Sequence, residues 1–332
     1  MSAFAQCHPH EAFCAYTHGL RHKWAYLART VPNIDHLFKP LETLLHQRFL
    51  PVLTNRPPTD EFERKLHSLP PRLGSLGITD PTTLKKEYSY SVKVTAPIVG
   101  LITSKADSAG SNGRQSRTST VVTEPRLLKR EVVREKAKDV QTEAQELSNQ
   151  LTEPLKRAML LAQERGASSW LTALPPQYQG FNLHKGAFRD ALAIRYGWEL
   201  SQVPSSCVCG NAFTIDHAMI CRHGGYPTLR HNEIRDLTAS LLSEVCSDVQ
   251  TEPSLQPVAG ERLPPSSNKK DDARLDIRAR GFWCNDHPAA FFDVRVFHPN
   301  AASYRKSPIE SVYRRHQSLK KQEYGPRVTN IE

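Results

Sequence analysis

Two aspartates near the C-terminal end of the chain have the spacing of a divalent-metal site. Asp276 stands near the end of the run 273–277, and Asp293 stands inside the run 291–297. Phe, Val and Ile dominate these runs, which is typical of β-strands, and Gly, Asn, Asp and Pro supply turn chemistry between them. We therefore expect the two carboxylates to face each other across a hairpin.

This pair of acids predicts magnesium chemistry. Carboxylates on rigid strands are hard oxygen ligands, and bound Mg²⁺ keeps waters that can be activated against a phosphodiester. Arg295 follows Asp293 by two positions, so we expect it on the same strand face. Its guanidinium can stabilise negative charge but cannot be a general base, because it keeps its proton. The alternative is a structural pairing of these acids with Arg274, Arg278 or Arg295.

A helix is predicted after the second acid, over residues 308–324. Its buried stripe is expected to contain Ile309, Val312, His316 and Leu319. Lys320 lies at the border of this stripe and is a candidate to lean over a site on the adjoining sheet. The alternative is a solvated basic face formed by Arg314, Arg315, Lys320 and Lys321.

A second helix is predicted upstream, opening at residues 230–236. Apolar residues at helical spacing follow along it, namely Ile234, Leu237, Leu241 and Val245. Asn232 is the predicted N-cap. Glu233 lies beside the apolar stripe, where it is either a third acid for the metal or an ordinary carboxylate of the first helical turn.

Three thiols and one imidazole stand close together just before this helix. They are Cys207, Cys209, His217 and Cys221. Such ligands suit tetrahedral Zn²⁺, and the four-residue step from His217 to Cys221 is about one helical turn. The single residue between the first two cysteines is tighter than the usual spacing, and His223 is a possible substitute ligand. Unconnected reduced cysteines are the alternative.

The order of these parts resembles a known family. A Cys/Cys/His/Cys knuckle, an Arg-His-Asn helix, a strand ending in Asp276, a strand with Asp293-Val-Arg-Val and a Lys-rich helix with tyrosines are similar to the restriction-like endonuclease end of non-LTR retrotransposon polyproteins. Those endonucleases belong to the PD-(D/E)xK superfamily. The resemblance covers roughly residues 200–332.

The resemblance implies a metal-dependent DNA endonuclease with Mg²⁺ at the acids and structural Zn²⁺ at the knuckle. DNA is the implied partner, with element RNA as a second, and the implied location is intracellular and nuclear. Nucleic-acid contacts are assigned to Arg230, His231, Arg314, Arg315 and Lys321. The family's proline before the first acid is replaced by Leu275, and its strand lysine by Arg295, so a lysine from the helix, Lys320 or Lys321, would have to take over.

The N-terminal half is mostly helical in its pattern. Residues 17–24 and 69–78 are similar to the helical region after the polymerase palm of such reverse transcriptases. The aromatic-x-Asp-Asp turn of a polymerase is absent from the sequence, so no DNA synthesis is expected. One amphipathic face is predicted from Leu37, Leu41, Leu44, Leu45 and Phe49.

These observations predict a multidomain α+β or α/β protein. The expected parts are a helical region at 1–103, a flexible linker at 104–124, a helical stalk and connector at 125–200, a zinc-knuckle-like segment at 201–230 and a restriction-endonuclease-like α/β domain at 231–332. Because the chain stops soon after the last helix, we expect a truncated domain and one piece of a longer element.

Composition agrees with a nucleic-acid partner. Lys and Arg total 44 against 34 acids, a formal net charge of +10, which favours a polyanion. Apolar stretches are far shorter than the roughly 20 residues of a spanning helix. Seven cysteines without a signal peptide indicate a reducing compartment. Two other functions stay open: a catalytically inactive nucleic-acid-binding fragment of a decayed retroelement, and a structural or protein-interaction domain.

Overall fold

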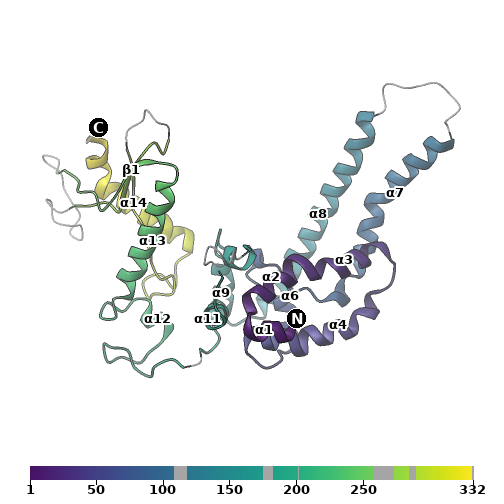
Figure 1. Ribbon diagram of the computed structural model, residues 1–332, viewed down its shortest axis with the longest axis horizontal. Coiled ribbons are helices and arrows are strands. Elements are labelled where there is room, and N and C mark those ends of the chain that lie inside the picture. The colour runs from purple at the N-terminus through teal and green to yellow at the C-terminus, as the bar shows by residue number, and fades with distance from the viewer. Residues whose placement is uncertain (108–117, 175–181, 201, 257–272, 284–288, 331–332) are drawn as a thin grey trace. The chain divides into compact units, whose positions relative to one another are not determined.

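The chain forms two compact units, Met1–Ser201 and Gln202–Glu332 (Figure 1). The computed structural model describes residues 1–107, 118–174, 182–200, 202–256, 273–283 and 289–330. Among these residues, the first unit is built from helices and the second combines helices with a small sheet. The coarse prediction of a helical first half followed by a mixed α and β part is confirmed. The boundary falls where the zinc-knuckle-like segment was predicted to begin.

Short helices joined by tight turns build the first part of the N-terminal unit. They are α1 (Ser2–Cys7), α2 (Pro9–Ala15), α3 (Arg21–Thr30), α4 (Lys39–Leu44), α5 (Leu50–Thr54) and α6 (Glu61–Ser68). Single turns of π-helix at Tyr16–Leu20 and Leu45–Phe49 join α2 to α3 and α4 to α5, and 3₁₀ turns occur at Asp35–Phe38, Pro71–Leu73 and Pro81–Thr83.

The predicted amphipathic face of residues 37–49 is only partly correct. Leu45 and Phe49 are buried, whereas Leu37 and Leu44 are exposed. The segment changes from 3₁₀ to α to π-helix along its length. Each change alters the number of residues per turn, so an ideal spacing of 3.6 residues does not keep one face toward the core.

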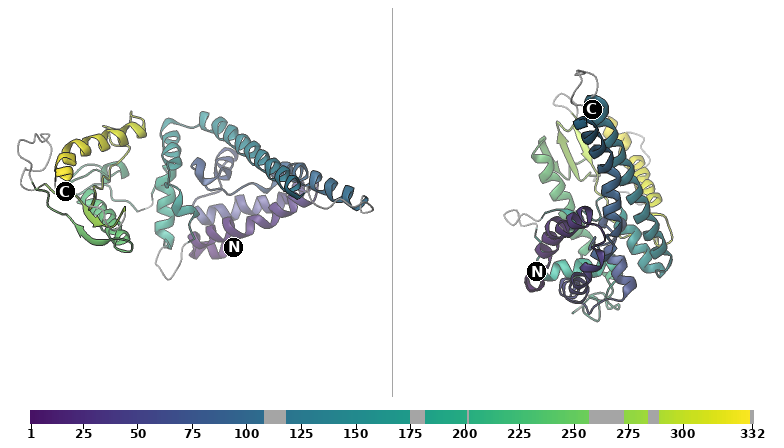
Figure 2. Two further views of the ribbon diagram at one scale, coloured as in Figure 1. Left: turned by 90° about the horizontal axis from the view of Figure 1, so that it is seen from above. Right: turned by 90° about the vertical axis from the view of Figure 1, so that its right-hand side faces the viewer.

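A long helical hairpin forms the second part of this unit. Its helices are α7 (Lys85–Asp107) and α8 (Thr118–Asn149), which lie side by side (Figure 2) and are joined by ion pairs Lys86–Asp139 and Lys136–Glu87, each 2.7 Å long. The predicted stalk is thus one arm of a hairpin. The predicted linker 104–124 is helical at both ends, and its middle, 108–117, lies outside the described residues.

The remaining helices return to the first part of the unit. They are α9 (Glu153–Gln163), α10 (Ser169–Thr172) and α11 (Lys185–Tyr196). Phe188 and Leu192 of α11 are fully buried against Phe13 and Leu53. The predicted ranges 1–103 and 125–200 therefore share one hydrophobic core and are not separate domains. The short N-terminal helices bury their apolar side chains against α11.

The C-terminal unit contains a three-stranded antiparallel sheet in the order β1-β2-β3. Its elements are α12 (Ile215–Ala218), α13 (Tyr226–Ser243), β1 (Ser247–Thr251), β2 (Ile277–Arg280), β3 (Ala290–Phe292) and α14 (Ile309–Asn330). Ile277 pairs with both Thr251 and Phe292. Residues of α13 pack on Ile277 and Ala279, and Tyr324 of α14 packs on a second cluster with Leu275.

The predicted strands differ from those in the structure: the first, at 273–277, is displaced to β2 at 277–280, and the second, at 291–297, is shortened to β3 at 290–292. Asp276 stands just before β2 and Asp293 just after β3. The Asp276 Oδ2 atom accepts a hydrogen bond of 2.5 Å from the backbone N–H of Val294. The Asp276 side chain thus takes the backbone N–H that would otherwise pair with β2, and the β2–β3 ladder ends after Phe292. Arg295 is outside the strand, so the predicted two-residue alternation does not apply to it.

The predicted helices exist but differ in their ends and faces. Helix α13 begins at Tyr226 after Gly225, whose φ is 69°, so Asn232 is inside the helix and is not its cap. Its predicted stripe, Ile234, Leu237, Leu241 and Val245, is exposed, and Ala239 and Leu242 are buried instead. On α14, Val312 is buried but Leu319 is exposed. Small residues suffice where a helix lies close to a sheet, which hydropathy alone does not reveal.

Candidate metal centres

A tight turn and a short helix build the zinc-like segment. The backbone N–H of Cys207 donates to Asn211 O (2.8 Å), and Gly210 N–H donates to Cys207 O (2.8 Å). Gly210 has a φ of 86°, a left-handed conformation that glycine adopts without strain. Thr214 caps α12 by accepting from the N–H of His217 (3.0 Å). This turn explains how cysteines separated by one residue can both point to one centre.

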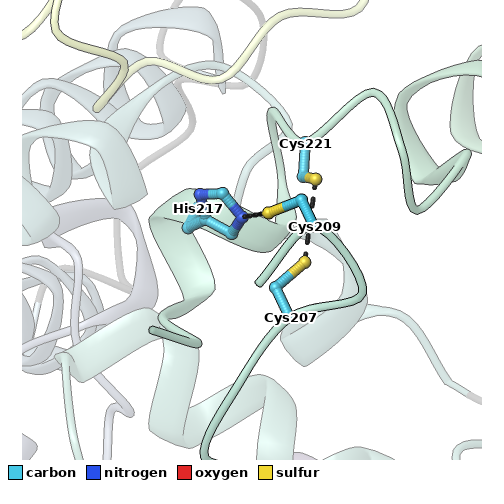
Figure 3. Close-up of side chains that lie close together, drawn as sticks. All are labelled: Cys207, Cys209, His217 and Cys221. Carbon is cyan, nitrogen blue, oxygen red and sulfur yellow. Dashed lines mark hydrogen bonds between the residues drawn. The ribbon is translucent and has the colours of Figure 1, made fainter. Parts of the chain in front are cut away.

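The four predicted ligands converge on one point (Figure 3). The Cys207 and Cys221 Sγ atoms are 3.7 Å apart, and Cys209 Sγ lies 3.1 Å from His217 Nε2. All four ligand atoms lie within 4.8 Å of one another. Zn–S bonds of about 2.3 Å in a tetrahedron place two sulfurs about 3.8 Å apart. We call these four side chains the Cys/His cluster; it could bind a metal such as zinc, and His223 is not one of its members.

The pKa values of two thiols in the Cys/His cluster are shifted in opposite directions: that of Cys207 is raised and that of Cys221 is lowered. The backbone N–H of Gly224 holds the pKa of the Cys221 thiol below its usual value. A hydrogen bond to sulfur favours the thiolate, which is the form that binds metal. The ligands come from a turn, a helix and the segment just after that helix, so a bound ion would cross-link all three.

One ion pair connects this segment to the loop that follows β3. Asp216, adjacent to His217 on α12, has its Oδ1 atom 2.7 Å from Nε2 of the buried His298. Arg305 approaches the other carboxylate oxygen at 3.8 Å. The segment that carries the Cys/His cluster is therefore attached to the loop between Asp293 and α14.

The two predicted metal-binding aspartates line one cavity of about 220 Å³, here called the carboxylate cavity. Its lining comprises His231, Arg274, Asp276, Asp293, Val294, Arg295, Val296, Lys320 and Tyr324. The register of the hairpin accounts for this, because Ile277 and Phe292 are paired and the two acids are the next residues beyond that pair. Strand pairing thus brings Asp276 and Asp293 to the same end of the sheet.

Each acid of the carboxylate cavity has a distinct partner. Asp276 Oδ1 lies 3.0 Å from Nε2 of His231 on α13, while its Oδ2 holds the Val294 N–H. Lys320 Nζ donates to Asp293 Oδ1 at 3.2 Å and lies 3.7 Å from Glu323 Oε2. Lys320 thus extends from α14 to the end of the β2–β3 hairpin. Asp276 is oriented by hydrogen bonds, and Asp293 by a cation.

Burial raises the pKa of Asp293 above its ordinary value. The neighbouring Asp276 acts in the same direction and Lys320 opposes both. Removing a carboxylate from water disfavours its charged form, and a second carboxylate nearby adds repulsion. A cation entering the cavity would relieve that repulsion, which is the electrostatic property expected of a metal site.

Several predicted site residues lie elsewhere. Glu233 is exposed and does not line the carboxylate cavity. Among the described residues the Cys/His cluster alone gathers three or more His, Cys, Asp or Glu ligand atoms, so no third such ligand completes a compact set around the two acids. Arg230 stacks over Tyr226, with 5.7 Å between its Cζ atom and the ring centroid. Arg314, Arg315 and Lys321 are exposed on α14.

The sequence did not predict where two residues of the site lie. His231 was expected to contact nucleic acid and instead contacts Asp276. Glu323 lies three residues after Lys320, one helical turn away, and shares its ammonium group with Asp293. The i,i+3 spacing of Lys320 and Glu323 was visible in the sequence, whereas the approach of His231 depends on how α13 packs on the sheet.

No protein-family model, curated protein or solved structure matches this chain. No helix in the described ranges is long and apolar enough to cross a membrane. The features that bear on function are therefore the two candidate centres and the charged side chains around them.

Proposed function

We propose that the C-terminal unit is a Mg²⁺-dependent DNA endonuclease that hydrolyses a phosphodiester bond to nick its target. One observation carries this proposal: Asp276 and Asp293 line the same cavity at one end of the β2–β3 hairpin, with Lys320 on Asp293. Two carboxylates beside a lysine are what a phosphodiesterase needs to hold a hard cation and a phosphate together.

The donor set fits Mg²⁺. This ion is commonly held by one or two carboxylates and keeps several waters, so the lack of a third acid does not exclude it. The chemistry such an ion supplies when bound is activation of a water and neutralisation of charge on the phosphate. In this assignment Asp276 and Asp293 hold the ion, and His231 keeps the Asp276 carboxylate oriented.

The cationic side chains have separate tasks in this proposal. Lys320, which is next to Asp293, stabilises the negative charge that develops on the phosphate. Arg295 lines the same cavity and can do the same, although it cannot remove a proton from water. The exposed Arg314, Arg315 and Lys321 of α14 are assigned to sequence-independent phosphate contacts, together with Arg230.

The Cys/His cluster is proposed to hold Zn²⁺ and to stabilise the loop that ends at the active site. The pairing of Asp216 with His298 supports this role. The order of the knuckle, the two acids and the basic helix supports a further proposal, that the chain is part of a non-LTR retrotransposon polyprotein with a restriction-like endonuclease fold. Nuclear location and contact with DNA or element RNA are further proposals that depend on that one.

A second candidate is a unit that binds nucleic acid without cutting it. The observation that favours it is the ion pair between Lys320 and Asp293, which neutralises one of the two acids. Arg295 in place of the family's strand lysine points the same way. Binding without cleavage would still show a steep loss of affinity as salt rises, because released counterions dominate such binding.

Nicking of supercoiled plasmid by the purified full chain tests the proposal. With Mg²⁺ we expect conversion to open circles, and Asp276→Asn should reduce the rate on the order of 10³-fold, as loss of a group that holds the metal would. Asp236→Asn is the matched control, because Asp236 is an exposed acid on α13 that pairs with Arg235. Equal rates for Asp276→Asn and the wild type would refute the assignment of the site.

A further inference from the structure

A second and larger cavity adjoins the carboxylate cavity. Its volume is about 430 Å³, and we call it the aromatic cavity. The two cavities share Asp293, Arg295, Lys320 and Tyr324 in their linings. A molecule with one group at the carboxylates can therefore extend its next group into the aromatic cavity.

Aromatic and aliphatic side chains dominate the lining of this cavity. The Phe297 ring contacts Tyr313 and His316, with ring centroids 5.6 Å and 5.2 Å apart. Phe291 and Leu275 belong to the adjacent hydrophobic cluster and continue the apolar surface. The volume is within the range of about 300–1,000 Å³ that is usual for small-molecule sites. A flat apolar ring system suits such a space.

Cationic groups stand at the edge of this apolar space. Arg295, Lys320 and Lys321 all contribute to the lining. Burial lowers the pKa of His316, and the positive charges of Arg295 and Arg315 lower it further, so the charged form of the imidazole is disfavoured. The lining of the aromatic cavity thus combines three cationic side chains and the Asp293 carboxylate with the rings of Phe297 and Tyr313.

A planar ring joined to an anion is the ligand that this combination fits, and a nucleotide has that chemistry. We propose that the aromatic cavity receives one unpaired base of the DNA strand whose neighbouring phosphate lies at Asp276 and Asp293. This inference rests on the proposed endonuclease function. It defines the substrate class as DNA with an unpaired nucleotide beside the bond to be cut.

The physical reason for this preference is the position of bases in a duplex. A paired base is stacked inside the helix and cannot reach a side-chain cavity unless it is unstacked and unpaired at a cost in free energy. A base that is already unpaired avoids this cost, and stacking on aromatic side chains stabilises it without regard to sequence. Selectivity would then come from DNA structure more than from base identity.

A binding experiment tests the cavity without requiring cleavage. The probe is a DNA duplex with a single unpaired 2-aminopurine, whose fluorescence falls when the base stacks on an aromatic ring. We expect quenching with the full-length wild-type chain in buffer that contains Ca²⁺ in place of Mg²⁺, so that a hard cation is still present at the carboxylates. Tyr313→Leu should weaken binding of this probe by about 5- to 100-fold, in keeping with the loss of one stacking partner. Tyr313→Trp should restore it.

The control for this experiment is Trp283→Leu, which removes an exposed aromatic ring of the same unit that does not line the cavity. Binding by this variant should equal that of the wild type. Tyr313 is itself 46% exposed, so its replacement is not expected to unfold the unit, and the thermal melting temperature checks this. Quenching that is unchanged in Tyr313→Leu would overturn the inference.

Cleavage of matched oligonucleotides separates this inference from the proposed function. We expect at least about tenfold faster cutting beside an unpaired nucleotide than in the fully paired duplex, in line with the saved unstacking energy. Equal cutting of both duplexes would overturn the inference and leave the endonuclease intact. If neither duplex is cut, the proposed function fails, and the 2-aminopurine result alone decides whether the aromatic cavity binds a base.

Discussion

The two candidate metal centres of the C-terminal unit differ in how much of the chain builds them. The Cys/His cluster lies within residues 207–221, and one turn, one short helix and the segment just after that helix position its ligands. The carboxylate cavity takes Asp276 and Asp293 from the ends of two strands and Lys320 from the middle of α14. The first centre is local and the second depends on strand register and helix packing.

This difference predicts that the two centres respond differently to loss of a metal ion and to single substitutions. A local centre whose ligands are tied together by an ion should lose stability when the ion is removed, because the free energy of metal binding is then part of the folding free energy of that segment. A distributed centre is held by the sheet and by α14, so single side-chain changes should alter its chemistry without unfolding the unit.

Metal removal should have the largest effect, and it should be confined to one unit. We expect one Zn²⁺ per chain by elemental analysis, lost in the double variant Cys209→Ser/Cys221→Ser. Structural zinc supplies folding free energy of about 10 kcal/mol in small domains, so the thermal transition of the C-terminal unit should fall sharply. The control is Cys7→Ser, which changes an exposed thiol of the N-terminal unit. A wild-type chain without zinc would contradict the assignment.

Loss of the lysine should reduce cleavage without affecting stability. Lys320→Ala is expected to lower the nicking rate about 10²- to 10³-fold, the usual effect of removing one group that stabilises transition-state charge. Lys320→Arg should retain part of the rate because the charge is kept. Lys306→Ala is a suitable control, since Lys306 is exposed and lines neither cavity. A rate in Lys320→Ala like that of the wild type would argue for binding without catalysis.

The pH dependence of nicking should follow Asp293. Its pKa is raised by burial, so the carboxylate becomes protonated at a higher pH than usual as the solution is acidified. Only the ionised form binds a cation well; activity should therefore fall as pH drops through this raised pKa. Because Lys320 lowers the pKa of Asp293, the acidic limb should move to higher pH in Lys320→Ala. A limb that moves to lower pH would contradict the assigned electrostatics.

Replacement of Glu233 should have the smallest effect. The side chain was a candidate third acid, but it is exposed and outside the carboxylate cavity. Glu233→Gln should therefore nick plasmid within about twofold of the wild-type rate, as surface changes away from a site usually do. A loss comparable with that of Asp276→Asn would mean that α13 moves toward the acids when DNA binds.

The features that the sequence predicts most directly are those whose chemistry and structure are both local. The ligand set of the Cys/His cluster follows from residue types and spacing within one segment. The meeting of Asp276 and Asp293 follows from two apolar runs joined by turn residues. In each case the interacting residues belong to one turn, one helix or one hairpin, whose geometry is set by short-range rules.

The failures have a common physical cause. Helix α13 exposes Leu237 and Leu241 and buries Ala239 and Leu242, because the packing of the helix on Ile277 and Ala279 decides which of its faces is covered. The ladder of β3 ends when the Asp276 side chain takes the Val294 N–H. Neither event is encoded in the periodicity of the element concerned, since each depends on a group far away in the chain.

Residue types and local spacing are enough to show which ligand atoms are available and which neighbours can share a metal, because a turn at Gly210 and a single helical turn suffice to join Cys207 and Cys209 to His217. Tertiary packing was needed to show that α11 completes the N-terminal core and that Lys320 and His231 reach the two acids. Such contacts join residues tens of positions apart, and their geometry depends on packing free energies summed over whole elements, which no local pattern contains.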